Sequence, residues 1–308
     1  MGRLVDLSRS GEAPRPAWTG QSERSQTVVM RVYAWIALTL GRPAARLILY
    51  PITGYFLLFS VRARAASRKY LRKVLRREPR VSDMFRHYHT FASTILDRVF
   101  LLKGEYSRFA IRTFNEEIVA EEAARGEGCF LVGAHMGSFE VIRSLGHHAR
   151  GLDVVMVLYE ENGRKLHAVL EAINPNLPLQ IIPLGHLDSM LKVERALDAG
   201  AFVGMLADRT ITGDDTMACS FLSEPARLPV GPFRLAAMLN RPIVLMFGLF
   251  RGGNRYVIHF ERLADMRGVD RKNRAAVIEQ TLRRYVQRLE HYVEIAPYNW
   301  FNFYDYWA

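Results

Sequence analysis

Short apolar runs alternate with amphipathic segments over the central and C-terminal parts of the chain. The runs have the length of buried strands, and the segments between them carry apolar residues at helical spacing. This alternation predicts an α/β fold with a mainly parallel central sheet flanked by helices, whose sites lie at the carboxyl ends of the strands. Predicted strands cover 128–134, 153–158, 180–183, 201–206, 242–250 and 256–260, the last a candidate for antiparallel pairing. Predicted helices cover 82–102, 115–125, 139–148, 163–173, 189–199, 230–240 and 270–294.

The N-terminal quarter follows a different pattern. Its first residues are polar and are expected to form a flexible leader rather than a secretory signal. Two uncharged runs follow, Val32–Leu40 and Leu47–Val61, separated by Gly41-Arg42-Pro43. The longer run falls short of the roughly 20 residues that span a bilayer. We therefore divide the chain into a leader (1–27), an apolar and basic segment (28–80) and an α/β domain (81–308).

Charge sharpens the interpretation of the basic segment. The 308-residue chain has a formal charge of +11, which indicates a polyanionic neighbour: nucleic acid, an acidic lipid surface or an acidic protein. Residues 61–80 hold nine Lys and Arg residues against one acid, Glu78, directly after the apolar run. Such adjacency is typical of apolar helices that attach to an anionic leaflet. The alternative is a buried helical hairpin followed by a solvated basic helix. Whether residues 28–61 cross, enter or lie on a bilayer stays open.

Cysteine and histidine spacing argues against disulfide and metal chemistry. Cys129 and Cys219 form no CxxC pair and fit core positions in a reducing compartment. His87 and His89 are two positions apart, so they would point to different faces of a helix, and we expect them on its exterior. The sequence indicates neither a metal nor a cofactor.

The strongest candidate chemistry follows the first central strand, in the stretch GAHMGSFE. His135 would stand at the carboxyl end of the strand and Glu140 in the first turns of the next helix. The two side chains can meet only if His135 lies in a turn, for which Gly133 and Gly137 give the backbone freedom. A carboxylate on one imidazole nitrogen raises the basicity of the other, which can then take a proton from a hydroxyl. The alternative is a histidine that caps the helix while Glu140 complements its dipole.

Two further charged blocks follow predicted strands and should reach the same edge of the sheet. The block that contains Arg164 follows the strand at 153–158, and Asp208 and Arg209 follow the strand at 201–206. The planar guanidinium of an arginine in such a position suits a phosphate group. Each of these residues could instead be a charge on a surface loop.

Together these motifs resemble a known family. The spacing of His135 and Glu140 looks like the H-x4-D/E motif of the lysophospholipid acyltransferase superfamily, in its Glu form (HX4E). That form is typical of the branch that includes the bacterial lipid A secondary acyltransferases, the lauroyl and myristoyl transferases. The resemblance covers nearly the whole chain from about residue 30. It includes the apolar anchor, the basic segment and the blocks at 163–165 and 207–209.

The resemblance implies an acyltransferase with a glycerolipid-acyltransferase-like sheet. It implies an acyl-carrier-protein thioester as donor, with acyl-CoA as the other option, and a lipid A-like acceptor at the cytoplasmic face of the bacterial inner membrane. His135 would be the general base and Glu140 the acid that orients it, without cofactor or metal. Arg164 and Asp208 would line the active site. Arg209 departs from the pattern of many lipid A enzymes, and we expect it to contact substrate as well.

The aromatic tail, PYNWFNFYDYW, has three possible roles. It could pack over the sheet, form an interfacial patch or line an acyl groove. The lipid A enzymes also end in a Trp-rich block, but often with basic or His residues where this chain has Tyr304 and Asp305. This difference argues against fixing the acceptor as lipid A itself.

Other functions remain open at this stage. The same mechanism could act on a glycerolipid, an aminolipid or a polyene lipid. A lipid thioesterase or hydrolase would need the same base, because water and a lipid hydroxyl lose a proton in the same way. Charge alone would also suit a nucleic-acid-binding protein, but no nucleic-acid motif accompanies it, so we expect no nucleic-acid partner. Acyl length and oligomeric state are not encoded in any pattern found here.

Overall fold

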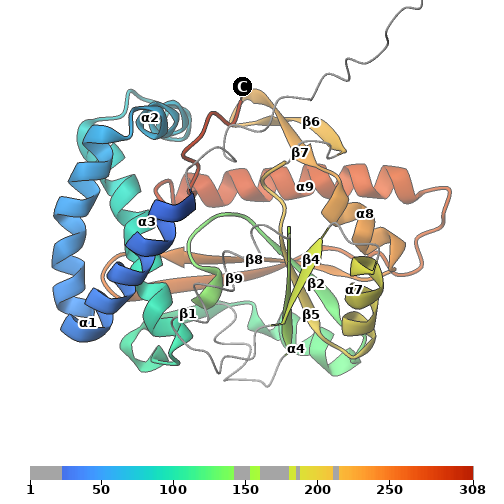
Figure 1. Cartoon of the computed structure of the whole chain (residues 1–308). Coiled ribbons are helices and arrows are strands. Elements are labelled where there is room, and N and C mark those ends of the chain that lie inside the picture. Colours follow the sequence, from blue (N-terminus) through green and yellow to red (C-terminus); the bar gives the residue numbers. More distant parts are fainter. Residues whose placement is uncertain (1–22, 142–152, 160–179, 185–187, 211–214, 308) are drawn as a thin grey trace, which may run out of the picture.

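The computed structural model describes residues 23–141, 153–159, 180–184, 188–210 and 215–307. In these residues a seven-stranded sheet has the order β1-β9-β8-β2-β5-β3-β4 (Figure 1). Its neighbours are parallel except β8 and β9, which confirms the mainly parallel sheet and the antiparallel last strand. The strands are β1 (Ala110–Phe114), β2 (Cys129–Gly133), β3 (Val154–Tyr159), β4 (Ile181–Leu184), β5 (Phe202–Leu206), β8 (Ile243–Phe250) and β9 (Arg255–Ala264).

Helices flank the sheet, and most of those predicted are present within a few residues. The helix predicted at 139–148 is described only over residues 139–141, and the one at 163–173 lies outside the described residues. A separate antiparallel hairpin, β6 (Thr216–Phe221) and β7 (Glu224–Pro229), was not expected from the sequence pattern. The helices are α1 (Glu23–Phe59), α2 (Val61–Leu75), α3 (Val81–Leu102), α4 (Glu116–Arg125), α7 (Ser189–Asp198), α8 (Gly231–Met238) and α9 (Arg274–Ile295), with a 3-10 turn at Tyr106–Arg108.

Strand β2 lies in the middle of the sheet, and both of its faces are buried. Phe130 and Val132 point into one apolar cluster, which also receives α7, α8 and α9. Cys129 and Leu131 point into the other, which receives α3 and α4. A continuous apolar run is therefore required here, since alternation would place polar groups in one of the two cores. This explains why the run at 128–134 carried a reliable strand prediction.

Helix α1 begins at Glu23, inside the segment expected to be a leader, and bends where the sequence predicted a break. Gly41 has φ 76° and ψ 165°, a backbone conformation that favours glycine. A further sharp bend of 96° separates α1 from α2. Among the described residues, no single helix is both long enough and apolar enough to cross a bilayer. The bent pair Gly41–Phe59 and Val61–Leu75, taken together, has the length and composition of a membrane span. The predicted membrane-attachment helices are thus not confirmed.

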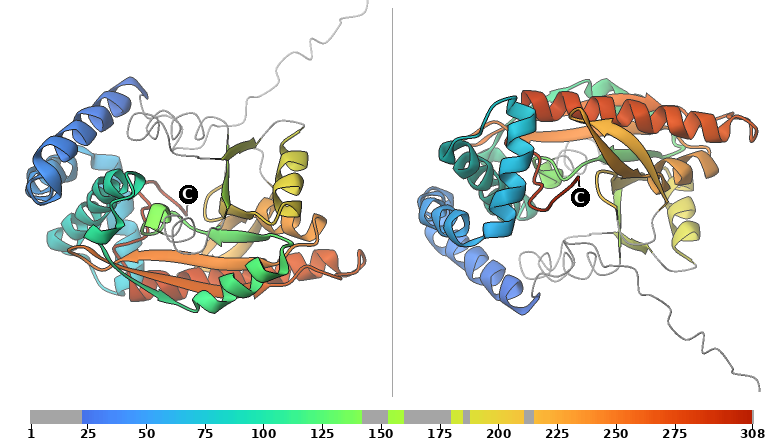
Figure 2. Two further views of the ribbon diagram at one scale, coloured as in Figure 1. Left: turned by 90° about the horizontal axis from the view of Figure 1, so that it is seen from below. Right: turned by 90° about the horizontal axis from the view of Figure 1, so that it is seen from above.

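The three N-terminal helices gather at one side of the molecule, and α7 and α8 lie at the other (Figure 2). The C-terminal segment passes between α2 and the sheet. Tyr70 of α2 donates a hydrogen bond to the Pro297 carbonyl at 2.7 Å, and Lys69 pairs with Asp305 at 2.7 Å. Trp300, the largest fully buried side chain, lies beside Tyr70 with ring centroids 5.0 Å apart. The aromatic tail therefore packs the N-terminal helices onto the sheet, which is one of the three roles considered.

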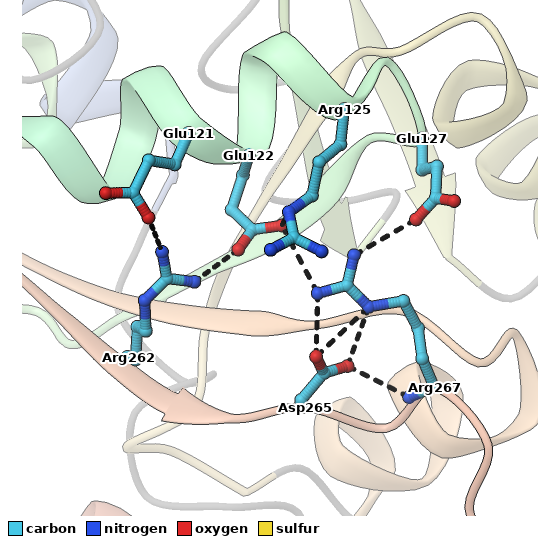
Figure 3. Close-up of polar contacts among 7 residues, drawn as sticks. All are labelled: Glu121, Glu122, Arg125, Glu127, Arg262, Asp265 and Arg267. Carbon is cyan, nitrogen blue, oxygen red and sulfur yellow. Dashed lines mark hydrogen bonds and ion pairs between the residues drawn. The ribbon is translucent and has the colours of Figure 1, made fainter.

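A buried carboxylate fixes α4 to the end of β9 (Figure 3). Glu122 is 2% exposed and pairs with Arg262, with Arg267 at 3.6 Å and with Arg125 at 3.8 Å. We expect Glu122→Gln to lower the free energy of unfolding by about 1.5–3 kcal/mol, because buried hydrogen bonds to a charged group are lost. Glu121→Gln, which removes an exposed partner of Arg262, should cost under about 1 kcal/mol. Urea unfolding of both variants tests this, and equal losses would contradict it.

Candidate active site

His135 lies in the turn between β2 and the helix that begins at Phe139, as the sequence predicted. The turn depends on Gly137, which has φ 65° and whose absent side chain would collide with the Gly248 carbonyl. The Gly137 N–H donates to the Asn299 carbonyl at 2.9 Å, and the Ser138 N–H donates to the Gly248 carbonyl at 2.8 Å. These two bonds lock the turn onto β8 and the C-terminal segment. The second predicted hinge, Gly133, ends the strand close to the Met246 carbonyl.

The side chain that binds the His135 imidazole is Asp208. His135 Nδ1 lies 2.8 Å from Asp208 Oδ1, and the His135 backbone N–H donates to the same oxygen at 3.1 Å. The two residues meet because β2 and β5 are parallel neighbours with Gly133 paired to Leu206, so each stands two positions beyond its strand end. Asp208 is 1% exposed. The prediction that the block after β5 converges on the histidine is confirmed for this residue.

The C-terminal segment completes the contacts of this pair. The Trp300 indole N–H donates to Asp208 Oδ2 at 2.9 Å, so both carboxylate oxygens accept hydrogen bonds. The Phe301 N–H donates to the His135 carbonyl at 2.9 Å. The side chain of Asn299 exchanges two hydrogen bonds with the Phe250 backbone, at 2.7 and 3.1 Å. Three consecutive residues of the tail are therefore bonded to the turn that carries His135, to Asp208 or to the end of β8.

The electrostatics of the pair leave a neutral histidine beside an ionised aspartate. Burial and the nearby Arg209 guanidinium lower the pKa of His135, and Asp208 opposes them only in part. Burial disfavours the charge of Asp208, yet the bond to His135, Arg209 and the Trp300 indole together hold its pKa at about 2. With Nδ1–H donated to the carboxylate, the lone pair of the neutral imidazole resides on Nε2. This is the state in which a histidine accepts a proton at neutral pH.

Glu140 lies in a different set of contacts from the one predicted. Its Oε1 is 2.8 Å from Arg98 Nε of α3, and the Ser138 hydroxyl lies 3.4 Å from its Oε2. The carboxylate found on the imidazole is therefore that of Asp208, because the start of the helix at Phe139 carries Glu140 toward α3. The orientation of His135 by Glu140 remains a prediction, and the variants treated in the Discussion distinguish the two carboxylates.

His135 opens on a cleft of about 880 Å³ between α2, α3, the two strand ends and the C-terminal segment. A cleft of this volume is within the range of pockets that bind substrates or cofactors. Its walls carry both cationic and large apolar residues. The cations are Arg62, Lys69, Arg98 and Arg209, and the larger apolar residues are Phe91, Ile95, Phe139, Leu206, Phe301 and Phe303.

Of the two predicted arginines, only Arg209 can be placed. Its guanidinium donates to the Phe301 carbonyl at 2.8 Å, lies 5.5 Å from the centre of the Tyr304 ring and lines the cleft. Arg164 lies outside the described residues. In the part of the chain that the structure describes, no group of three or more His, Cys, Asp and Glu side chains could hold a metal ion.

Three contributors to the site were missed from the sequence. Trp300 and Arg98 carried no motif. His87 was expected on a helix exterior, and that expectation was wrong, because its side chain is fully buried. Its Nε2 lies 2.8 Å from the Trp300 carbonyl, and Ser67 Oγ lies 2.9 Å from its Nδ1. Burial lowers the pKa of His87 to about 4, so the ring is neutral and accepts one bond while it donates the other.

The fold and the site define an α/β protein that holds a hydrogen-bonded histidine at the carboxyl end of a central strand, beside a cleft of about 880 Å³. A family model described as bacterial lipid A biosynthesis acyltransferase matches residues 24–308. The chain therefore belongs to this family and is an acyltransferase, which sets aside the nucleic-acid-binding alternative. No curated protein matches the sequence significantly.

Trp300 should act as a positioning residue for Asp208. We expect Trp300→Phe to lower kcat about 10- to 100-fold, because one hydrogen bond to a buried charged group is lost. Trp307→Phe is the matched control, since the Trp307 indole donates instead to the Phe221 carbonyl. Acyl-transfer kinetics and thermal melting of both variants test the assignment. Equal losses of kcat in the two variants would mean that Trp300 contributes only packing.

The charge of Arg209 should contribute, after burial, to the pH dependence of the reaction. Arg209 lowers the pKa of His135, so Arg209→Gln should raise that pKa and move the acid limb of kcat/KM to higher pH. The wild-type limb should lie below the ordinary histidine value of 6.5. Arg195→Gln, an exposed change on α7, should leave the limb in place. An unmoved limb in Arg209→Gln would rule out this electrostatic role.

Proposed function

We propose that the protein moves a fatty acyl chain from an acyl-carrier-protein thioester to a hydroxyl of a lipid A-like membrane glycolipid. The observation that carries the proposal is the His135–Asp208 hydrogen bond of 2.8 Å beside a cleft of about 880 Å³, in a chain of the lipid A acyltransferase family. Asp208 holds Nδ1–H, which leaves Nε2 as the general base. The acyl-CoA thioester is the other donor that the same chemistry would accept.

In the proposed reaction Nε2 of His135 takes the proton of the acceptor hydroxyl as its oxygen attacks the thioester carbonyl carbon. The tetrahedral intermediate then collapses, the C–S bond breaks, and the thiolate leaves with the proton returned from Nε2. The amides of Gly137 and Ser138 already donate to backbone carbonyls. Arg98 and Arg209 line the cleft and both act electrostatically on His135, so we assign them the stabilisation of the developing oxyanion.

Within this proposal Glu140 is the second carboxylate of the site. Its ion pair with Arg98 is 8% exposed on the carboxylate side, so it fixes a guanidinium at the cleft wall. The family motif gives Glu140 the role of orienting His135, and the proposal keeps that role as an alternative. Arg164 is proposed as a further substrate-binding arginine on the strength of the family resemblance alone.

A membrane surface is proposed as the place where the acceptor is reached. Large apolar residues are exposed along the second half of α1 and its junction with α2, next to Arg62 at the cleft. Such a patch with an adjacent cation suits the interface of an anionic leaflet, here the cytoplasmic face of the bacterial inner membrane. The exposed residues are Leu47, Tyr50, Tyr55, Phe56, Leu58, Phe59 and Val61.

The basic segment contributes less free charge than its composition suggests. Arg68 and Arg72 both pair with Glu78, and Lys73 pairs with Glu224. Lys69 and Arg76 pair with Asp305 and Glu294. Much of the charge of α2 is thus matched by acids within the chain. Docking of an acidic carrier protein would rely chiefly on the cations at the cleft itself.

The test is acyl transfer by the detergent-solubilised protein. Acyl-carrier-protein thioesters and acyl-CoA are supplied separately with a total bacterial lipid extract, and mass spectrometry identifies the acylated product. The expected product is an acylated glycolipid made from the carrier-protein thioester. A glycerolipid, aminolipid or polyene product would correct the acceptor and keep the mechanism. Release of free fatty acid without any acylated lipid would overturn the transfer and identify a hydrolase.

A further inference from the structure

A second pocket, of about 410 Å³, shares no lining residue with the catalytic cleft. Three arginines from three separate elements reach it: Arg46 of α1, Arg86 of α3 and Arg251 directly after β8. The other walls come from His89, Thr90 and the turn at 295–299. Its described lining contains no Asp or Glu, so the arginine charge is not balanced from within.

The three guanidinium groups are held in place by contacts that leave their charge unneutralised. Arg46 lies 5.7 Å from the centre of the Phe250 ring, and Arg86 lies 4.6 Å from that of Tyr298. Arg251 Nη1 donates to the Ile295 carbonyl at 3.0 Å. Among the described residues, none of the three arginines forms an ion pair. Arg46 does interact electrostatically with the Asp97 carboxylate. That carboxylate is already hydrogen bonded to Arg42 and to the Tyr256 hydroxyl.

Two buried nitrogen atoms of the pocket residues also lack partners. Arg46 Nη1 and His89 Nε2 are inaccessible to solvent and receive no hydrogen bond partner from the described part of the chain. A buried donor without a partner costs roughly 1–3 kcal/mol, so such groups are normally satisfied by a ligand or by water. Burial and the neighbouring Arg46 lower the pKa of His89, and burial lowers the pKa of Arg251. Both shifts mean that a positive charge is costly in this pocket, and a bound anion would offset that cost.

The arginines of the pocket indicate which kind of anion it would bind. Converging planar guanidinium groups match the oxygens of a phosphate, which can accept several charge-assisted hydrogen bonds at once. The pocket also adjoins the apolar side of α1, where Leu47 is 71% and Tyr50 54% exposed. The Tyr50 ring lies 4.7 Å from the ring of His89. A phosphate that carries acyl chains could therefore place its headgroup at the arginines and its chains along α1.

We propose that Arg46, Arg86 and Arg251 form a phosphate-binding pocket, separate from the catalytic cleft, that takes the headgroup of an anionic phospholipid. The proposal goes beyond acyl transfer and does not depend on the identity of donor or acceptor. Asn299 connects the two regions, because it lines this pocket while its carbonyl accepts the Gly137 N–H in the turn of His135. The pocket is thus linked to the active-site turn through Asn299.

The test measures binding by the full chain and by the double variant Arg86→Gln/Arg251→Gln, whose two side chains are exposed and should not disturb folding. Sedimentation with vesicles of phosphatidylglycerol in phosphatidylcholine reports the lipid headgroup. Calorimetric titration with inorganic phosphate reports free phosphate. The control, Arg195→Gln/Arg255→Gln, removes the same charge at two other exposed arginines, neither of which forms an ion pair among the described residues.

We expect the pocket variant to lose vesicle affinity about tenfold and the control to lose much less. Weakened binding of inorganic phosphate with unchanged vesicle binding would assign the pocket to free phosphate. Equal vesicle losses in variant and control, with no phosphate binding by the wild type, would overturn the site and leave only general attraction between a basic protein and an acidic surface.

Discussion

Replacing His135 by alanine should lower kcat for acyl transfer by about 10²–10⁴-fold, the range that a general base contributes. The reason is geometric. The Asp208 carboxylate binds Nδ1 of His135, which leaves Nε2 available to take a proton, and the residue lines the cleft. The side chain is 35% exposed, but Asp208 is buried and would lose one of its hydrogen bonds, so the variant should also lose about 1.5–3 kcal/mol of stability, which thermal melting measures. Single-turnover measurement of acyl transfer separates the chemical step from product release.

His291→Gln is the matched control for this prediction. His291 is exposed on α9, so its replacement changes one histidine without touching the cleft. Both variants should retain binding of the thioester donor, because the cations at the cleft are unchanged. Full transfer by His135→Ala would refute the general-base assignment outright. Loss of transfer in both variants would point to a fault in folding or assay rather than to chemistry.

The part of the site that could be predicted is the part encoded by neighbouring residues. The strand before His135 is apolar on both faces, and Gly137 has the positive φ that the following turn requires. These features made both the strand and the position of the histidine visible in the sequence. Asp208 was predicted to reach the same edge because it follows another buried strand. Its pairing with the imidazole depends on the register of Gly133 with Leu206, which no local pattern contains.

The remaining contacts join positions far apart in the chain. Trp300 and Asp208 are separated by 92 residues, and a tryptophan in an aromatic tail is equally consistent with packing, an interface or an acyl groove. His87 was misplaced because a polar residue on a helix is usually exposed. Here Ser67 and the Trp300 carbonyl satisfy both ring nitrogens, which permits complete burial.

Strands were missed where exposure hides the apolar pattern. In β1 (Ala110–Phe114) the residues alternate between exposed and half-buried, because the strand lies at the edge of the sheet. In the β6–β7 hairpin only part of each strand is buried, and Pro225 and Pro229 obscure the strand character. The basic run after the apolar segment was correctly found, but its ion pairs with distant acids such as Glu224 and Glu294 could not be foreseen.

Asp208→Asn should be nearly as damaging as loss of the base, with kcat lowered about 10²–10⁴-fold. Three donors reach the two carboxylate oxygens: the His135 backbone N–H, His135 Nδ1–H and the Trp300 indole N–H. An amide has one acceptor oxygen, so in either orientation its NH₂ group faces a donor. The imidazole then loses its fixed orientation or its Nδ1–H tautomer, and the lone pair on Nε2 is no longer assured.

The pH profile distinguishes Asp208 from Glu140 as the carboxylate that acts on His135. Asp208 raises the pKa of His135, so Asp208→Asn should lower that pKa and move the acid limb of the residual kcat/KM to lower pH, opposite to Arg209→Gln. Glu140→Gln removes the carboxylate that pairs with Arg98 and should lower kcat. The acid limb should stay in place, because Glu140 contacts Arg98 and not His135. A downward shift in Glu140→Gln with none in Asp208→Asn would restore the pairing that the H-x4-E spacing predicts. It would also mean that the bond between His135 and Asp208 is not the one used in catalysis.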